Sequence, residues 1–401
     1  MKSYVNRANP GVNLPALRGH NAALVLDLLR GAGEAGISRL ELAERTGLTP
    51  QAVSKITARL RAEGLAAEAG RRASTGGKPR TVLRLVPDAG HAVGLHLDRD
   101  ELTAVLVDLT GTVVAERRAP LAFAAGAEAV VEAAAGEARG LLAGLGEGAS
   151  GAGSFRDEVL GAQEAAPGVG PRAGGGVSGV GVALPGPLDH VGGVLRRVTG
   201  FPGWDGFPLR DALAARLGLP VVVDKDTNAA ALGLALAGAD AAGSFAYLHL
   251  GTGLGAGLVL GGALHRGART GAGEFGHQVL QLDGPRCECG DRGCVEALCL
   301  AAVARGDLEE AARVLGTAAA NLVGLLDVDR VLLGGRTVFA ADELFVRGVG
   351  AVVAERVRRG GGEAEVPVAL APGGERAVAE GAAQLVLAPL FGRASVGFIA
   401  G

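Results

Sequence analysis

The segment "GHQVLQLDGPRCECGDRGCVE", Gly276 to Glu296, decides how the rest of this chain is interpreted. It gathers one His and three Cys in a sequence that is otherwise apolar and rich in Gly. The candidate metal ligands are His277, Cys287, Cys289 and Cys294. Three thiolates and one imidazole complete the tetrahedral coordination of Zn²⁺ without an added water. We therefore expect a closed, structural zinc site and no hydrolytic metal centre.

Other interpretations of these cysteines are weaker. A Cys-X-Cys pair is poorly placed to form a disulfide with itself, and the reducing compartment expected for this chain disfavours disulfides in general. Redox sensing by the cluster stays open as an alternative. Cys299 lies in the apolar stretch "EALCLAAVA", so we expect it to be a small buried residue of a helix, not a ligand.

Composition narrows the function classes. With 401 residues, of which 48% are hydrophobic, the chain can build two or three domains with their own cores. Aromatic residues make up only 3%, which argues against stacking platforms for single-stranded nucleic acid. The uncharged run from Phe245 to Leu264 contains six Gly and His249, so it predicts strand, turn and strand and not a membrane helix. The start "MKSYVNRANPGVN" lacks a signal-peptide core, and we expect a cytoplasmic protein with no membrane partner.

The charge is distributed unevenly along the chain. Residues 1–86 hold 14 Lys and Arg against 6 Asp and Glu, whereas the remainder holds 25 basic and 36 acidic residues. A basic head on an acidic body indicates a polyanionic partner for the head alone.

The basic head has the pattern of a helix-turn-helix. A first helix from Asn21 ends near Gly31. A second opens with Ser38 and Glu41 at capping-box spacing. The third helix has Thr49 at its N-cap and Pro50 at its first position. Two short helices joined by a turn that contains Gly are typical of this DNA-binding motif.

The DNA-contacting residues can be named on this pattern. The third helix would present four polar residues to the major groove of double-stranded DNA: Thr49, Gln51, Ser54 and Lys55. A solvated helix face is the plainer alternative. However, "LAAEAGRRASTGGKPRTVLRL" follows as two strand-like runs around a basic tip with Arg71, Arg72, Lys78 and Arg80. Such a wing contacts phosphates or the minor groove, so we predict a winged helix-turn-helix over residues 1–86.

The body alternates strands and helices, as expected of an α/β protein. Three antiparallel strands are predicted within residues 92–121, and a mobile insertion without a function of its own within about 146–176. The strand in "GLPVVVDKDTNAAALG" delivers Asp224, Lys225, Asp226 and Asn228 to a helix start. Ligands of open α/β sheets bind at such positions, although Asp226 and Asn228 could also act as ordinary helix caps.

The segments "LHLGTGLGAGLVLGGALHRGARTGAGEFGH" and "CECGDRGCVE" together resemble the signature of the ROK family of bacterial sugar kinases and sugar-responsive repressors. The resemblance runs from about Val93 onward. It implies an actin-like (ribonuclease H-like) α/β domain over residues 87–401, with two lobes around a sugar cleft. Lobe 1 would hold about 87–240 and a C-terminal helix near 375–392, and lobe 2 about 241–374.

The same resemblance implies roles for five residues. Glu274 and His277 would bind sugar hydroxyls, with His277 also holding zinc, and Glu296 would reach the same sugar. The family's Asn-Asp pair falls on Lys225 and Asp226, where the Asp is the base in kinases. The zinc loop would then hold the sugar site in place. Lys225 departs from the family pattern, which leaves the choice of sugar open.

The kinase activity of the family is not expected here. Its Asp-X-Gly-Gly-Thr phosphate loop aligns with His96, Asp98, Arg99 and Asp100, so the glycines that close on ATP phosphates are replaced and acidic charge is added. Asp226 would be a vestigial base. We expect a repressor whose affinity for operator DNA is modulated by a sugar or sugar derivative, acting as a homodimer or homotetramer. An active kinase with a DNA-binding head and control by a protein partner are the alternatives.

Overall fold

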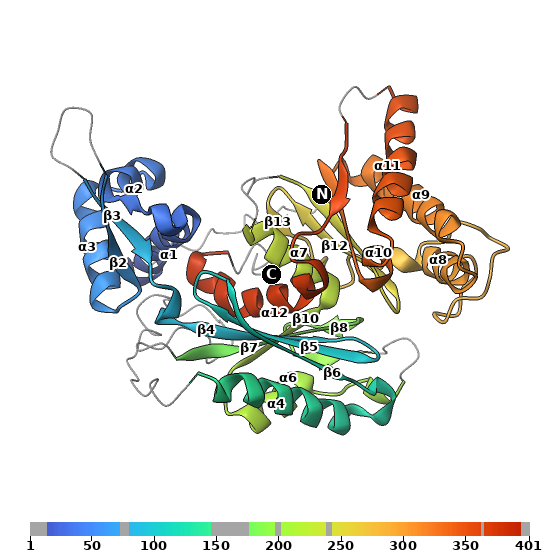
Figure 1. Cartoon of the computed structure of the whole chain (residues 1–401), viewed down its shortest axis with the longest axis horizontal. Coiled ribbons are helices and arrows are strands. Elements are labelled where there is room, and N and C mark those ends of the chain that lie inside the picture. Colours follow the sequence, from blue (N-terminus) through green and yellow to red (C-terminus); the bar gives the residue numbers. More distant parts are fainter. Residues whose placement is uncertain are drawn as a thin grey trace, which may run out of the picture.

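The computed structural model describes residues 14–72, 80–145, 176–196, 202–237, 243–361 and 365–393. Figure 1 shows a small N-terminal head beside a two-lobed α/β body, which is the architecture implied by the sequence. Lys78 and residues 146–175 of the predicted insertion lie outside the described residues. Among the described helices, none is both long and apolar enough to cross a membrane.

The head is a winged helix-turn-helix. Its elements are α1 (Leu14–Ala32), β1 (Ile37–Ser38), α2 (Arg39–Thr46), α3 (Pro50–Ala62), β2 (Ala66–Arg72) and β3 (Arg80–Leu85), and the strands pair in the order β1-β3-β2. The predicted capping box is confirmed, since the Glu41 N–H donates to Ser38 Oγ at 3.3 Å and the Ser38 N–H donates to Glu41 Oε2 at 2.8 Å. Helix α1 begins seven residues before the predicted start at Asn21. Pro15, at its second position, needs no N–H there.

The two sheets of the body share one topology. The first has the order β10-β7-β4-β5-β6 and the second β13-β12-β11-β14-β15. In each, three strands form an antiparallel meander and two later strands add in parallel. The first sheet comprises β4 (His91–Leu97), β5 (Glu101–Asp108), β6 (Val113–Pro120), β7 (Val177–Leu184) and β10 (Val221–Lys225). The second comprises β11 (Phe245–Leu250), β12 (Leu254–Leu260), β13 (Ala263–Leu264), β14 (Arg330–Gly334) and β15 (Val368–Leu370).

Helices cover both outer faces and fill the space between the sheets (Figure 1). The outer face of the first sheet packs against α4 (Ala127–Ala143) and α6 (Leu209–Leu217). The second packs against α8 (Val295–Ala304), α9 (Leu308–Leu326) and α11 (Asp342–Arg359). A short helix, α10 (Arg336–Phe339), follows β14, and β8 (Leu188–Asp189) pairs with β9 (Val194–Leu195). Helices α7 (Asp226–Ala237) and α12 (Ala377–Leu387) lie between the sheets.

Helix α12 approaches its neighbours to backbone contact. A Cβ on Gly94 of β4 would lie 2.0 Å from the Ala379 carbonyl oxygen, and one on Gly181 of β7 would lie 1.8 Å from that of Ala382. On the other side, a Cβ on Gly381 would lie 2.0 Å from the Ala229 carbonyl oxygen of α7. Only glycine allows such separations, so these positions fix α12 against both β7 and α7.

The head is not joined to the body by a free linker. Val25, Leu26 and Leu29 of α1 belong to the same buried cluster as Val107 of β5 and Phe391 of the 3₁₀ turn η8 (Ala388–Phe391). Two polar contacts border this cluster. Arg393 donates to both Asp27 carboxylate oxygens at 2.8 and 3.3 Å, and the Arg30 guanidinium lies 4.8 Å from the centre of the Phe391 ring. Head and body therefore share one hydrophobic core.

The α12 packing predicts opposite effects of one substitution at two glycines. Gly181→Ala should lower the free energy of unfolding by about 3 kcal/mol, because the new methyl group can be accommodated only by moving α12. Gly136→Ala, in the exposed interior of α4 with no atom within 4 Å of the added Cβ, should raise it by about 0.5–1 kcal/mol. Thermal unfolding followed by circular dichroism checks the pair, and equal midpoints would contradict this account of the packing.

Candidate functional site

One cleft lies between the two sheets and encloses about 640 Å³, open solvent included. It collects residues from both halves of the body. The five residues that the sequence proposes for sugar binding all line it: Lys225, Asp226, Glu274, His277 and Glu296. Asp98 and Arg99, which the sequence analysis aligned with the family's phosphate loop, line it too. Residues separated by up to about half the chain in sequence are thus neighbours in space.

Lys225 and Asp226 enter the cleft because β10 ends at Lys225 and α7 begins at Asp226. Lys225 is buried, and its Nζ donates to the Ala272 carbonyl oxygen and, at 3.0 Å, to Glu274 Oε1. The ammonium therefore has both a carbonyl and a carboxylate partner, which a buried cation requires. The Asp226 carboxylate accepts the Thr227 N–H at 2.6 Å in the first turn of α7.

Asp224 lies behind these two residues and is held by hydrogen bonds to its neighbours. Its Oδ1 accepts the Lys225 N–H and the Asn228 side-chain amide, both at 2.8 Å, and its Oδ2 accepts Arg266 Nε at 2.7 Å. Because both oxygens of this buried carboxylate accept hydrogen bonds from within the protein, Asp224 supports the cleft and does not present itself to a ligand. Asn228 is likewise a structural partner of Asp224.

Glu274, His277 and Glu296 come from the second half. Glu274 precedes the 3₁₀ turn η6 (Phe275–His277), and its side chain is 42% exposed, so a ligand can reach the carboxylate. Glu296 lies in the first turn of α8 and is buried. Its Oε2 accepts the Leu254 N–H at 2.8 Å, which ties α8 to the start of β12.

The predicted metal ligands converge. The ligand atoms of His277, Cys287, Cys289 and Cys294 all lie within 4.8 Å of one another. His277 Nδ1 is 3.6 Å from Cys287 Sγ, and Cys289 Sγ is 3.7 Å from Cys294 Sγ. Bonds of about 2.3 Å to sulfur and about 2.0 Å to nitrogen in a tetrahedron give edges of roughly 3.5–3.8 Å. The donor set therefore fits a tetrahedral cation such as zinc.

Burial favours the neutral form of two of the thiols when no cation is bound. Burial raises the pKa of Cys294 to about 12 and also raises that of Cys287, so the protein alone holds both as neutral thiols. A bound divalent cation reverses this preference, since coordination stabilises the thiolate. Cys299 lies apart from this cluster, buried in α8 with its Sγ 3.7 Å from the Ala311 carbonyl oxygen.

The loop around the cluster is shaped by short-range backbone hydrogen bonds. The Cys287 N–H donates to the Asp291 carbonyl at 2.8 Å, and the Gly293 N–H donates to that of Pro285 at 2.8 Å. Gly293 has a φ of 66°, and a Cβ there would lie 1.6 Å from the Gln281 carbonyl oxygen, so no other residue fits. Cys294 then caps α8, which places Glu296 two residues beyond the last ligand.

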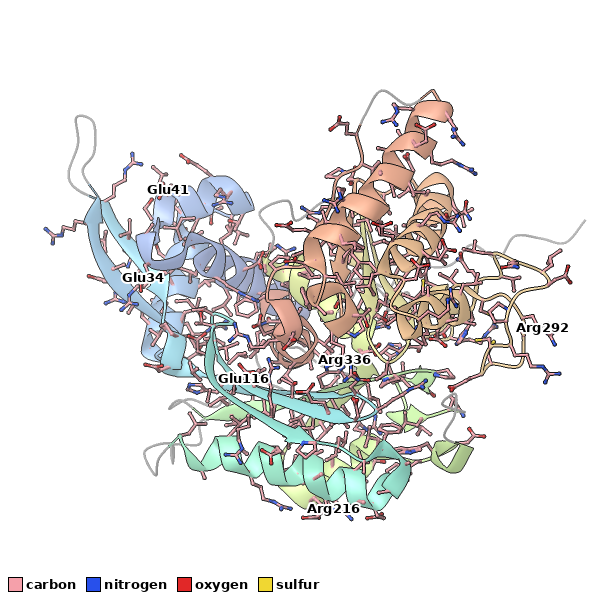
Figure 2. All side chains as sticks on the ribbon, turned by 45° about the vertical axis from the view of Figure 1, so that its right-hand side comes forward. Glu34, Glu41, Glu116, Arg216, Arg292 and Arg336 are labelled. Atoms are coloured by element: carbon pink, nitrogen blue, oxygen red, sulfur yellow. The ribbon has the colours of Figure 1, made fainter. Side chains whose placement is uncertain are left out.

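Asp98 and Asp100 are contacted by side chains that the sequence analysis did not single out. Asp98 Oδ1 accepts Thr252 Oγ1 at 2.6 Å, and Arg336 Nη2 donates to Asp98 Oδ2 at 3.3 Å and to Asp100 Oδ1 at 2.5 Å. Figure 2 shows Arg336 where the ribbons of the two halves meet. No local spacing connects these residues, because they lie more than 150 positions from Asp98.

The predicted DNA contacts lie on the head. Thr49 caps α3, accepting the Ala52 N–H at 3.2 Å, and Gln51, Ser54 and Lys55 are exposed on its first turns. Arg71 and Arg80 are exposed near the ends of β2 and β3, and Arg72 ends β2 opposite Arg80. The exposed helix start and the basic strand ends both belong to the compact head, apart from the cleft.

Comparisons with known proteins agree with this geometry. A model of the ROK family matches residues 170–304, and one of winged helix-turn-helix DNA-binding domains matches residues 24–66. The xylose repressor of Bacillus subtilis (strain 168) is 28% identical over 262 residues, which are 65% of this chain and 61% of that protein. A glucokinase of Thermotoga maritima is 43% identical over 133 residues, 33% of this chain and 42% of that enzyme.

A solved structure extends the agreement to the fold of nearly the whole chain. The crystal structure of a ROK family transcriptional regulator, described as a homologue of the E. coli MLC protein, superposes with a TM-score of 0.69 at 22% identity. The superposition covers 94% of this chain and 98% of that one. This chain combines a ROK family domain with an N-terminal winged helix-turn-helix.

Proposed function

We propose that this protein is a transcriptional repressor that binds operator DNA through its head. Its affinity for the operator changes when a sugar or sugar derivative occupies the cleft. The observation that carries the proposal is the convergence of Lys225, Asp226, Glu274, His277 and Glu296 in one cleft of a chain that also bears a winged helix-turn-helix. Relatives named repressors support the same function.

The chemistry of the cleft suits a polyhydroxyl ligand. Carboxylates accept hydrogen bonds from sugar hydroxyls, whereas an ammonium and an imidazole can donate to them. Asp226 and Glu274 offer the acceptors, and Lys225 offers a fixed donor. Since Lys225 can only donate, it requires an acceptor atom of the ligand, and we assign it the role of selecting among sugars.

We assign the cysteine cluster to structural zinc, held by His277, Cys287, Cys289 and Cys294. Four protein ligands leave no open position for a reacting water. When bound, the cation would supply a fixed crosslink between η6 and the start of α8, which carry His277 and Glu296. The cluster would thus set the spacing of two sugar-binding residues.

Phosphoryl transfer is the second candidate function, because Asp226 is present and a relative is a glucokinase. We propose that it is absent. Asp98 and Asp100 stand where ATP phosphates would need backbone N–H donors, and Arg336 is already paired with both carboxylates. The negative charges of Asp98 and Asp100 would repel a polyphosphate bound beside them.

Regulation requires that the sugar bind one conformation of the protein better than another. We infer that closing of the two halves around the sugar is this change. It would reach the head through α12 and η8, which contact α7 on one side and α1 on the other. An operator with two-fold symmetry would be read by a homodimer or homotetramer.

Replacing a cluster cysteine should remove the metal. Cys289→Ser exchanges a thiolate for a hydroxyl, a poor zinc ligand, so the purified variant should hold well under half of the zinc in the wild-type protein. Inductively coupled plasma mass spectrometry measures the content. Cys299→Ser is the matched control and should keep full occupancy, because Cys299 lies outside the cluster. Equal zinc in wild type and Cys289→Ser would refute the assignment.

DNA binding and sugar response should separate in two variants. Lys55→Ala should weaken operator binding about tenfold with sugar affinity unchanged, since each base or phosphate contact contributes roughly 1–3 kcal/mol. Glu274→Ala should retain operator binding and lose the sugar response. Fluorescence anisotropy of the protein's own upstream DNA, titrated with a panel that includes xylose and glucose, measures both. Arg347→Ala on the exposed face of α11 is the control for lost positive charge.

Measurement of ATP turnover tests whether the protein is a kinase. A coupled assay of ADP formation across the same sugars should give no rate above the protein-free background. Rates in the range of about 1–100 per second, as kinases show, would overturn the repressor-only function.

A further inference from the structure

We propose that the turn Asp98–Asp100 is a positioning element of the sugar site, which holds the two halves of the cleft together with the chain's own carboxylates. The inference rests on the proposed function of the cleft and adds a role for residues outside the sugar-binding set. In this arrangement no nucleotide is needed to bridge the halves.

Asp98, Arg99 and Asp100 each make a side-chain contact across the cleft. Asp98 follows β4 of the first sheet, and its partner Thr252 lies in the turn between β11 and β12 of the second sheet. Arg336, which begins α10 after β14, donates to Asp98 and Asp100. Arg99 Nη1 donates to Glu288 Oε2 at 3.4 Å in the cysteine loop. Three consecutive residues therefore contact three separate segments of the other half.

Two of these segments adjoin proposed binding residues, one through Glu296 and the other within the cysteine cluster. Thr252 is two residues before Leu254, whose N–H donates to Glu296, and the Gly251 N–H closes the same turn by donating to the Gly253 carbonyl oxygen at 2.9 Å. Glu288 lies between Cys287 and Cys289. Fixing Thr252 and Glu288 thus fixes the surroundings of Glu296 and of the cysteine cluster.

Burial and electrostatics indicate that Asp98 contributes most to the contacts between the two halves. Its side chain is only 15% exposed, whereas that of Asp100 is 58% exposed and that of Glu288 is 63% exposed. Burial alone would raise the pKa of Asp98, but His96, the Thr252 hydroxyl and the Arg99 N–H lower it below its usual value. Hydrogen bonding to Asp100 raises the pKa of Arg336. Both partners are ionised, and a shielded, hydrogen-bonded carboxylate contributes more than an exposed ion pair.

The same contacts disfavour binding of a nucleotide beside the sugar. A hydroxyl and a guanidinium are groups that bind phosphate oxygens, and here the carboxylates of Asp98 and Asp100 already occupy them. The cleft can therefore close on a sugar alone. Removal of the carboxylates should loosen the β11–β12 turn even when no ligand is present.

Calorimetry on the full-length protein, with xylose and glucose as probes, tests the proposal. Asp98→Ala should weaken sugar binding about tenfold, since it removes the contacts to both Thr252 and Arg336. Arg336→Gln should weaken it about threefold, and Arg336→Lys, which keeps the cation, should stay within a factor of two of wild type. Arg313→Gln removes the exposed ion pair to Glu310 on α9 and is the matched control, with no expected change.

Amide hydrogen exchange supplies a readout that needs no sugar. In Asp98→Ala, the amides of residues 251–254 should exchange at least about fivefold faster than in wild type, while zinc content and exchange in β4 stay unchanged. Wild-type exchange rates in this turn would overturn the proposal whether or not a sugar binds. If neither probe binds the wild type and exchange still rises in the variant, the role of the turn in holding residues 251–254 stands, and binding of xylose or glucose in the cleft is refuted.

Discussion

The backbone contact between α12 and its neighbours is the constraint on which the arrangement of head, cleft and second lobe depends. Gly94, Gly181 and Gly381 leave no space for a side chain, so α12 cannot slide or rotate independently of β4, β7 and α7. Strand β4 leads into Asp98, and α7 begins at Asp226, both of which line the cleft. A single rigid helix therefore connects the walls of the cleft with the surface that supports α1.

Around this helix the cleft is built mainly from charges that satisfy one another. Lys225 pairs with Glu274, Arg266 pairs with Asp224, and Arg336 pairs with Asp98 and Asp100. Such a cleft holds its polar groups in place before a ligand arrives, which lowers the entropic cost of binding. The acidic turn Asp98–Asp100 is part of this network through its ion pairs with Arg336.

Sequence reasoning succeeded where the determining interactions are local. The capping box of Ser38 and Glu41 spans three residues, and the cysteine cluster closes within eighteen, so spacing alone predicts both. The gathering of Lys225, Asp226 and Glu274 in one cleft came from family resemblance, because no local pattern brings residues 49 positions apart together. Thr252 and Arg336 carry no signal in the sequence, since their partner Asp98 is 154 and 238 residues away.

The start of α1 is another feature that the sequence did not predict correctly. Its first turns precede the apolar pattern that marks the helix from Asn21, and Pro15 reads equally well as a loop residue. Local propensity is weak there, so the sequence pattern does not mark where the helix begins.

The hydrophobic core that α1 shares with β5 and η8 has a consequence for how such a protein can be re-engineered or can evolve. A head cut off near Val86 would expose Val25, Leu26 and Leu29 to water, and the remaining body would expose Phe391. Replacing the head with another DNA-binding domain therefore requires replacing the apolar surface of α1 that packs on the body as well, because head and body share one hydrophobic core.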